Sequence, residues 1–245
     1  MGVLRYSIPN SFTALSLLLG LGSIVTTQVG DLEFAAWLIV WCGLLDTMDG
    51  VAARVLNATS SFGAEFDSMA DLVSFGVAPA ILIFNLGLQY GGVELETGQF
   101  WVLVLACGVF VLAGAMRLAR FNLTSEVPHG GWFTGIPITV AGGGLLSSMV
   151  IVMIKYDEIS TVLPLHLYLP ILMFILGILM ISRVRFPKAT MRKSKIINAF
   201  QVVTIALIFV CGTLRIYPEY LFGIGVFLII AGTIAGRITR DKPNV

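Results

Sequence analysis

Four aspartates and one arginine lie within an otherwise apolar part of the chain. Asp46, Asp49 and Arg54 follow the apolar run LIVWCGLL, and Asp67 and Asp71 precede LVSFGVAPAILIF. A charged side chain at the centre of a membrane-spanning helix costs about 2.5–3.5 kcal/mol even on insertion scales. Such groups persist where they pair with one another or face a polar cavity. The stretch therefore predicts a site that does chemistry.

The spacing of these residues places them on two helix faces. Positions 46, 49, 50, 53 and 54 recur at the three- and four-residue intervals of one α-helical face, and positions 63, 67 and 71 do the same. The polar turn NATSS joins the two segments. Gly50, Ala53 and Gly63 leave room on these faces for a bulky ligand to approach the backbone. We therefore expect two helices that each present a pair of carboxylates to one site.

The charge of the cluster indicates what it binds. Four carboxylates and one guanidinium sum to −3, so the cluster needs a counter-charge. Hard divalent cations take oxygen ligands, and Mg²⁺ usually keeps coordination positions for substrate phosphates. A solvated acidic face on two amphipathic helices is the plainer alternative, but the flanking segments are too apolar for it. A divalent-cation transporter is a second alternative, although an ion path needs neither the arginine nor the glycine-lined gap.

The full pattern of this stretch matches a known signature. It reads D-x-x-D-G-x-x-A-R-x8-G-x-x-x-D-x-x-x-D from Asp46 to Asp71 and resembles the signature of the CDP-alcohol phosphatidyltransferases. The resemblance implies that a phosphatidyl group moves from a CDP-linked lipid to an alcohol, with release of CMP. It also implies Mg²⁺ or Mn²⁺ as cofactor, with two divalent ions, and a homodimer.

The resemblance also assigns roles to the matched residues. It makes Asp46, Asp49 and Asp67 ligands of metals that clamp the diphosphate, and makes Asp71 the general base that also touches the second metal. The start of the chain adds a P-N-x-x-T pattern, which the family places beside its nucleotide, although an asparagine after a proline is also a common helix start. The residues expected to bind the nucleotide and the lipid phosphates are Asn10, Thr13, Gly50, Ala53, Arg54, Ser60 and Gly63.

A second stretch bears on the acceptor alcohol. R-L-A-R-F-N, followed by F-x-G-x-P and A-G-G, resembles the phosphatidylserine synthase branch of the family, as does D-S-M-A-D-L-V-S-F-G-V-A-P-A. This implies CDP-diacylglycerol and L-serine as substrates, with Arg117, Arg120 and Asn122 expected at the acceptor. Arginine suits a carboxylate because its guanidinium can bind both oxygens. Membrane anchoring is the alternative role for both arginines. Glycerol phosphate or inositol phosphate as acceptor, and an archaeal ether lipid as donor, remain alternatives.

The elements that position these residues are membrane helices. The chain has 245 residues, of which 57% are hydrophobic and 12% charged, and its mean hydropathy is +0.94. This composition predicts an all-α, polytopic integral membrane protein, because a soluble domain of this size would offer water more polar surface. We expect one membrane-embedded domain over residues 1–245, with a motif core at 9–144 and additional transmembrane helices over 145–236. Membrane lipids are expected partners, and nucleic acid is not.

About eight apolar segments are long enough to cross a bilayer core of roughly 30 Å. They cover residues 10–28, 33–57, 61–88, 100–119, 134–154, 164–181, 197–214 and 218–236. Pro79 is expected to kink the third. The first is expected to be a span and not a cleavable signal peptide, because its apolar run is long.

The basic residues orient these segments. With a cytoplasmic N-terminus, only Lys155 and Arg215 of the 15 lysines and arginines fall on the far side of the membrane. An excess of basic residues marks the cytoplasmic side. The sequence therefore predicts a polar active site that faces the cytoplasm.

Overall fold

The computed structural model describes residues 2–124, 132–156, 163–187 and 195–240. Long helices make up most of the described chain, which confirms the predicted all-α membrane fold. The elements in chain order are α1 (Gly2–Val29), α2 (Leu32–Val55), α3 (Ser61–Asp71), η1 (Leu72–Val77), α4 (Ala78–Tyr90), α5 (Gly98–Thr124), β1 (Trp132–Thr134), η2 (Thr139–Leu146), α6 (Ser147–Lys155), α8 (Leu165–Ile181), β2 (Arg185–Pro187), α9 (Lys195–Leu214) and α10 (Pro218–Arg240).

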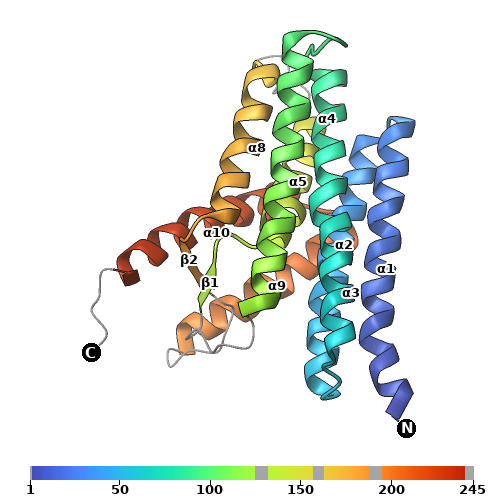
Figure 1. Cartoon of the computed structure of the whole chain (residues 1–245), viewed down its shortest axis with the longest axis vertical. Coiled ribbons are helices and arrows are strands. Elements are labelled where there is room, and N and C mark those ends of the chain that lie inside the picture. The colour runs from blue at the N-terminus through green and yellow to red at the C-terminus, as the bar shows by residue number, and fades with distance from the viewer. Residues whose placement is uncertain (1, 125–131, 157–162, 188–194, 241–245) are drawn as a thin grey trace.

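The first two helices form a tight antiparallel hairpin (Figure 1). Gly30 turns the chain with φ of +98°, a conformation that glycine adopts without a steric penalty. Asp31 then caps α2, because its side chain accepts a 3.0 Å hydrogen bond from the backbone N–H of Phe34. The hairpin sets the carboxyl-terminal part of α2, which carries the first two aspartates, beside the amino-terminal part of α1.

The start of α1 differs from the prediction. The helix begins at Gly2 and contains Pro9, so Asn10 lies inside the helix and is not its N-cap. Proline removes one helical hydrogen bond. That loss falls in the second turn, where Tyr6 and Ile8 are exposed. Because α1 begins at Gly2, the Asn10 side chain does not cap the helix.

The third predicted span is one continuous helical column with a changed pitch. α3 passes into the π-helical segment η1, which passes into α4, and Pro79 lies in the first turn of α4. A proline in the first turn of a helix loses an N–H that would have few partners there. The irregularity in this column is the π-helical segment that ends two residues before Pro79.

A second π-helical segment, η2, lies against the first. Gly142 and Gly143 of η2 face Phe75 of η1, and a Cβ built at Gly142 would come 2.8 Å from the backbone carbonyl carbon of Phe75. Only glycine permits this approach at position 142 without a shift of the backbone. The contact joins the α3–η1–α4 column to η2 and α6 in the centre of the molecule.

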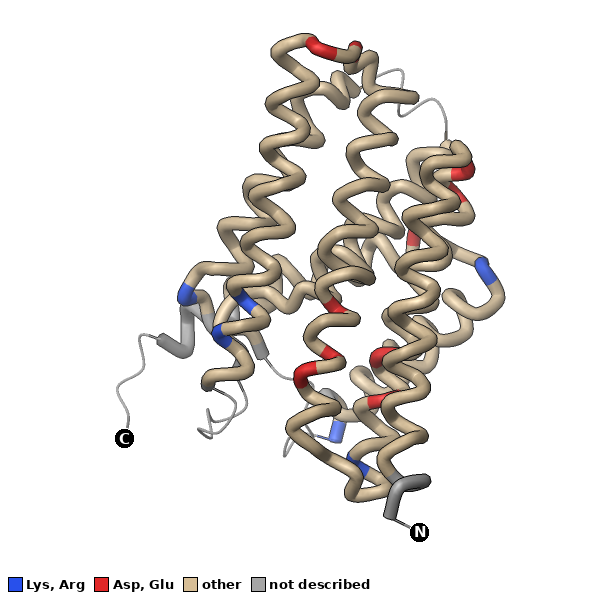
Figure 2. The backbone as a smooth tube through the Cα atoms, turned by 45° about the vertical axis from the view of Figure 1, so that its right-hand side comes forward, with Lys and Arg blue, Asp and Glu red and all other residues tan. Residues whose placement is uncertain are grey.

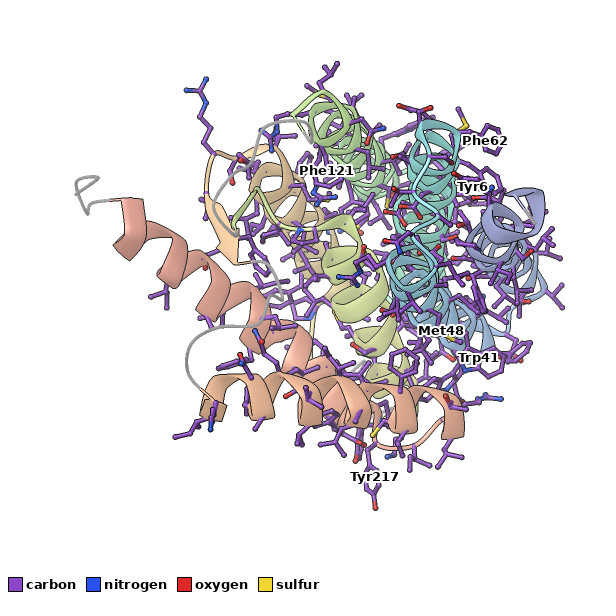
Figure 3. All side chains as sticks on the ribbon, turned by 90° about the horizontal axis from the view of Figure 1, so that it is seen from below. Tyr6, Trp41, Met48, Phe62, Phe121 and Tyr217 are labelled. Carbon is purple, nitrogen blue, oxygen red and sulfur yellow. The ribbon has the colours of Figure 1, made fainter. Side chains whose placement is uncertain are left out.

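Several helices are long and apolar enough to cross a membrane. Among the described residues these are 6–29, 32–55, 61–90 and 98–123, and shorter apolar helices cover 139–155, 165–181, 198–214 and 218–234. These eight segments coincide with the eight predicted spans, although eight crossings remain a prediction. Figure 3 shows most of the helices nearly end-on, with α9 and α10 running across them.

A short β ribbon joins the segment between α5 and η2 to the segment between α8 and α9. β1 and β2 pair antiparallel, with Phe133 opposite Phe186, and Gly135 after β1 donates to the Val184 carbonyl at 2.8 Å. The ribbon lies beside the end of α8 (Figure 1). It was not predicted, because three-residue strands leave almost no pattern in a sequence.

Candidate active site

The two acidic helices meet through the turn that joins them. Asn57 follows α2 with φ of 47°, a left-handed conformation in which asparagine is enriched. Ser60 then caps α3, since its Oγ accepts a 3.0 Å hydrogen bond from the Gly63 N–H. The turn brings carboxylate oxygens of Asp46, Asp49 and Asp67 within 4.8 Å of one another. In Figure 2 a group of acidic positions lies on neighbouring helices in the lower part of the molecule, and further acidic positions lie at its upper end.

α1 contributes a hydroxyl to this cluster. Thr13 Oγ1 donates a 2.9 Å hydrogen bond to Asp49 Oδ2, and both side chains are buried. A bound metal ligand is commonly oriented by such an outer hydrogen bond. The fold therefore places the P-N-x-x-T segment beside Asp49, and its predicted contact with a nucleotide remains a prediction.

One pocket opens between α1, α2 and α3, and we call it the α1–α3 pocket. It contains about 520 Å³ of empty space. Its lining residues are Pro9, Asn10, Thr13, Asp49, Gly50, Ala53, Ala58, Thr59, Ser60, Gly63, Ala64 and Asp67. Six of these were predicted to bind the nucleotide or the lipid phosphates. The structure therefore gathers those residues into one cavity beside the carboxylates.

The two glycines of the α1–α3 pocket differ in their surroundings. A Cβ at Gly50 would meet no protein atom within 4 Å, so the space above this residue belongs to the pocket. A Cβ at Gly63 would lie 3.1 Å from Ser60 Oγ and 3.2 Å from Asn10 Oδ1. Gly63 thus permits close packing of α1 against α3, whereas Gly50 leaves room for a ligand.

Arg54, the predicted phosphate contact, lies outside this lining. Its side chain is exposed, and Nε donates a 2.8 Å hydrogen bond to the Gly50 carbonyl of the same helix. The guanidinium is therefore at the end of α2 and apart from the buried carboxylates. A contact between Arg54 and a substrate phosphate remains a prediction.

A second pocket lies on the other face of α3, and we call it the α3–α5 pocket. It contains about 820 Å³ of empty space. Its lining residues are Ala64, Asp67, Ser68, Asp71, Arg117, Leu118, Phe121, Asn122, Pro137 and Thr139. Ala64 and Asp67 line both pockets. The two cavities therefore share a wall of α3 that contains Asp67, one of the clustered aspartates.

Arg117 lines the α3–α5 pocket together with the half-buried carboxylates of Asp67 and Asp71. It is 7% exposed and interacts electrostatically with Asp71 and Asp46, while its guanidinium carbon lies 5.9 Å from the ring centre of Phe121. Among the described residues, no hydrogen-bond partner faces its Nε. A buried donor without a partner carries a desolvation cost. The side chain therefore retains hydrogen-bonding capacity for a ligand in the α3–α5 pocket.

Arg120 has a different environment from Arg117. Its guanidinium donates to the carbonyls of Thr134 and Ile181 at 3.0 Å and to that of Met180 at 3.2 Å. Helix ends leave carbonyls without partners within the helix, and Arg120 satisfies those of α8. This arrangement joins α5, α8 and β1, and Arg120 does not line the α3–α5 pocket. Its predicted contact with the acceptor remains untested.

Asn122 lines the α3–α5 pocket but is bonded to α3. Its Nδ2 donates to Glu65 Oε2 at 3.2 Å and to Ser68 Oγ at 3.0 Å. These bonds join α5 to α3 next to Asp67. The predicted role of Asn122 at the acceptor remains a prediction.

Known proteins resemble this chain over most of its length. A family model described as CDP-alcohol phosphatidyltransferase matches residues 6–163. The chain belongs to the CDP-alcohol phosphatidyltransferase family. The match extends beyond the predicted motif core and includes all the residues of both pockets.

Three relatives illustrate the range of the similarity. The CDP-diacylglycerol–serine O-phosphatidyltransferase of Helicobacter pylori (strain ATCC 700392 / 26695) is 37% identical over 185 residues, which cover 74% of this chain and 72% of that protein. The enzyme of the same name from Bacillus subtilis (strain 168) is 35% identical, with 74% and 89% covered. The archaetidylserine synthase of Methanothermobacter thermautotrophicus is 31% identical, with 74% and 70% covered.

Membership of the CDP-alcohol phosphatidyltransferase family bears on two predictions. The divalent-cation transporter is not supported, because the matched family and the named relatives are transferases. CDP-alcohol phosphatidyltransferases generally use divalent metals, and three carboxylates within 4.8 Å form a donor set of hard oxygens that suits such an ion.

Some pocket residues were not predicted. Ser68, Phe121, Pro137 and Thr139 line the α3–α5 pocket. Pro137 is the last residue of the F-x-G-x-P motif and Thr139 lies two residues after it, so this motif was the available signal. Ser68 and Phe121 are neighbours of predicted residues, but only the packing of α3 against α5 shows that they face the cavity.

Proposed function

We propose that this enzyme transfers the phosphatidyl group of CDP-diacylglycerol to the hydroxyl of L-serine, giving phosphatidylserine and CMP. The observation that carries the proposal is the shared wall of the two pockets at Asp67. A donor diphosphate in the α1–α3 pocket and an acceptor in the α3–α5 pocket would meet at the carboxylates. The names of the Helicobacter and Bacillus relatives support serine as the acceptor.

The α1–α3 pocket is the proposed site of the cytidine diphosphate. Asn10, Thr13 and Ser60 supply polar groups, and Gly50 leaves the space that a phosphate needs. Asp46, Asp49 and Asp67 would hold Mg²⁺ or Mn²⁺, with Asp71 as a further ligand of a second ion. When bound, a divalent ion neutralises the charge of the diphosphate and of the leaving CMP.

The α3–α5 pocket is the proposed site of serine. Arg117 would bind the serine carboxylate, since its Nε lacks a partner among the described residues. The serine hydroxyl oxygen forms the new bond to the phosphorus of the phosphatidyl group, and the bond from that phosphorus to the CMP oxygen breaks. Asp71 accepts the hydroxyl proton. Because a carboxylate is a weak base for a hydroxyl, this transfer follows the development of the phosphorus–oxygen bond.

The lipid donor has a second candidate. The Methanothermobacter relative is named archaetidylserine synthase, so an ether-linked donor is compatible with the same nucleotide pocket. The head-group chemistry would be identical, because only the linkage of the lipid chains differs. The donor is therefore tested separately from the acceptor.

We also propose that the site faces the cytoplasm and that the enzyme is a homodimer. The distribution of lysine and arginine supports the orientation, and the family resemblance supports the dimer. Labelling of single-cysteine variants in intact and opened vesicles tests the orientation. Light scattering of the detergent-solubilised enzyme tests the dimer.

The decisive experiment measures CMP release with alternative substrates. Purified enzyme receives CDP-diacylglycerol with serine, glycerol 3-phosphate, inositol phosphate or choline, and the serine reaction is repeated with the ether-linked donor. We expect the highest kcat/KM with serine. A higher value with another alcohol would refute the acceptor and leave family membership intact, while absence of CMP release with every alcohol would refute the proposed reaction.

A further inference from the structure

A charged pocket lies far from the aspartates, at the amino-terminal end of α2, and we call it the α2–α10 pocket. Glu33 of this pocket is 13 residues before Asp46 on the same helix, which is about 20 Å along its axis. The pocket contains about 940 Å³ of empty space. Its lining residues are Glu33, Trp37, Ile151, Lys155, Arg215, Ile216, Tyr217 and Pro218.

Four helix ends build this pocket. α2 begins there, α6 ends at Lys155, and the turn from α9 to α10 closes one side. Arg215 and Tyr217 in that turn have φ of 55° and 49°, a left-handed conformation that is uncommon for residues with a side chain. The turn is therefore held in one conformation by its surroundings, and that conformation directs Arg215 toward α2.

Aromatic rings of α2 position the Arg215 side chain. Its guanidinium carbon lies 5.3 Å from the ring centre of Phe34 and 5.8 Å from that of Trp37. A guanidinium within about 6 Å of an aromatic face is attracted to it. Trp41 holds α2 against α9 in the same region, because its indole N–H donates a 2.9 Å hydrogen bond to the Gly212 carbonyl of α9. Arg215 is thus held at the pocket by cation–π contacts.

Two charged side chains of the α2–α10 pocket, Glu33 and Arg215, are available to bind a ligand because Lys155 pairs with Glu219. Lys155 Nζ lies 2.5 Å from Glu219 Oε1, and the Tyr156 hydroxyl donates to the same oxygen at 2.8 Å. Lys155 and Glu219 form the only ion pair among the described residues. Glu33 and Arg215 therefore line one pocket without pairing with each other.

Arg215 and Glu33 carry opposite charges, so together they complement a zwitterionic ligand. Arg215 presents a cation suited to a phosphate, because guanidinium binds two phosphate oxygens at once. Glu33 presents a carboxylate suited to an ammonium group, and its Oε1 already accepts a 3.4 Å hydrogen bond from Trp37 Nε1. With Lys155 and Glu219 compensating each other, the pocket suits a ligand that carries one charge of each sign.

The surroundings of the pocket favour a lipid over a soluble ligand. Large apolar side chains near it are exposed, including Val29 (81%), Leu214 (63%) and Tyr217 (66%). Figure 3 shows Tyr217 pointing away from the helices. Tryptophan and tyrosine are enriched where a membrane meets water. Lys155 and Arg215 are also the two basic residues that the sequence predicts on the far side of the membrane.

We propose that the α2–α10 pocket binds the head group of an aminophospholipid, with the phosphodiester at Arg215 and the primary ammonium at Glu33. The proposal concerns binding only and is independent of the transferase reaction. It predicts a lipid site at the end of the bundle opposite the active site. The bound head group would link α2 to the α9–α10 turn.

The test measures lipid binding to the detergent-solubilised full chain by native mass spectrometry. Dioctanoyl phosphatidylethanolamine carries both charged groups, and dioctanoyl phosphatidylglycerol carries only the phosphodiester. We expect the ethanolamine lipid to bind at least about tenfold more tightly, as a charge-assisted contact allows. Glu33→Gln should remove this preference, and Arg215→Gln should weaken both lipids about tenfold.

Controls separate this site from general lipid binding. Lys195→Gln removes an exposed charge at the opposite end of α9 and should change neither affinity. Arg215→Lys retains the charge and should bind better than Arg215→Gln, which keeps the test valid if the glutamine variant folds poorly. Equal binding of both lipids by the wild type, or an unchanged preference in Glu33→Gln, overturns the proposal. Equally tight binding of soluble glycerophosphoethanolamine overturns the assignment to a membrane lipid.

Discussion

Thr13 of α1 and Asp49 of α2 lie 36 residues apart in the chain and form a buried hydrogen bond of 2.9 Å. The hydroxyl donates to one carboxylate oxygen, Oδ2, so it fixes the orientation of the carboxylate. The other oxygen then points to a defined place relative to Asp46 and Asp67. Thr13 thereby orients a carboxylate of the acidic cluster, although it carries no carboxylate itself.

We predict that Thr13→Val weakens the metal site without unfolding the enzyme. Valine has nearly the shape of threonine but no hydroxyl, and loss of an outer hydrogen bond to a metal ligand typically costs about 10–100-fold in metal affinity or activity. The measurement is the Mg²⁺ concentration that gives half-maximal CMP release. Thr26→Val is the control, because the Thr26 hydroxyl bonds only to the Gly22 carbonyl of its own helix. An equal effect of both variants would contradict the orienting role of Thr13.

The helices of this enzyme were largely predictable from local sequence. The segment 164–181 was expected to be a helix, and α8 is Leu165–Ile181, because a continuous apolar run between polar turns has few other solutions in a membrane. The π-helical segments were not predictable in this way. They lie where Gly142 approaches the backbone of Phe75, and these two residues are far apart in the sequence.

The candidate site was predictable where one helix determines it. The intervals between Asp46, Asp49 and Gly50 fix their common face before any packing is known. The identity of the arginine near the carboxylates was not predictable from spacing. Arg54 shares the helix of Asp49, yet it is Arg117 that lines a pocket together with Asp71, because that arrangement depends on how α5 packs against α3.

We predict that Gly50→Leu blocks the nucleotide without loss of stability. A Cβ at position 50 would enter the α1–α3 pocket and meet no protein atom within 4 Å, and leucine is a better helix former than glycine. CDP-diacylglycerol affinity should fall at least about tenfold, while the thermal midpoint stays the same or rises. Gly108→Leu is the matched control, since Gly108 is an exposed helical glycine with equally open surroundings. Unchanged affinity in Gly50→Leu would place the nucleotide elsewhere.

The two arginines of α5 should give opposite results when each is replaced by glutamine. Arg117→Gln should raise the KM for serine by about tenfold or more, because one charge-assisted contact is lost. Arg120→Gln should instead lower the free energy of unfolding by about 1.5–3 kcal/mol, since carbonyls at the end of α8 lose their donor. Steady-state kinetics and denaturation of both variants test this. If Arg120→Gln changes the KM for serine and leaves stability intact, Arg120 contacts the acceptor as the sequence suggested.

Removal of divalent ions should abolish activity and lower thermal stability. The carboxylates of Asp46, Asp49 and Asp67 lie close together, and like charges at such distances repel one another in a buried site. At 100 times its dissociation constant a bound ion stabilises the fold by about 2.7 kcal/mol. The enzyme is treated with EDTA, and its thermal midpoint and CMP release are followed as Mg²⁺ or Mn²⁺ is restored. Full activity in a verified metal-free preparation would refute the metal site.

The last prediction separates the roles of Asp49 and Asp71. Asp49 lines the α1–α3 pocket, where the donor diphosphate is proposed to bind, and Asp71 lines the α3–α5 pocket, where the acceptor is proposed. Asp49→Asn should therefore weaken binding of the CDP-lipid as well as turnover. Asp71→Asn keeps the shape of the side chain and should largely keep CDP-lipid affinity. It should lower kcat by about 10²–10⁴-fold, the usual effect of losing a general base.

Binding isotherms for the CDP-lipid in the presence of metal, together with kcat for both variants, decide between these roles. If Asp71→Asn retains near wild-type kcat, the hydroxyl proton goes to another group. If it abolishes CDP-lipid binding as completely as Asp49→Asn does, Asp71 acts chiefly as a metal ligand. A base that also touches the second ion would weaken both steps, so the ratio of the binding loss to the kcat loss must be compared between the two variants. We expect that ratio to be much smaller for Asp71→Asn, because Asp71 does not line the nucleotide pocket.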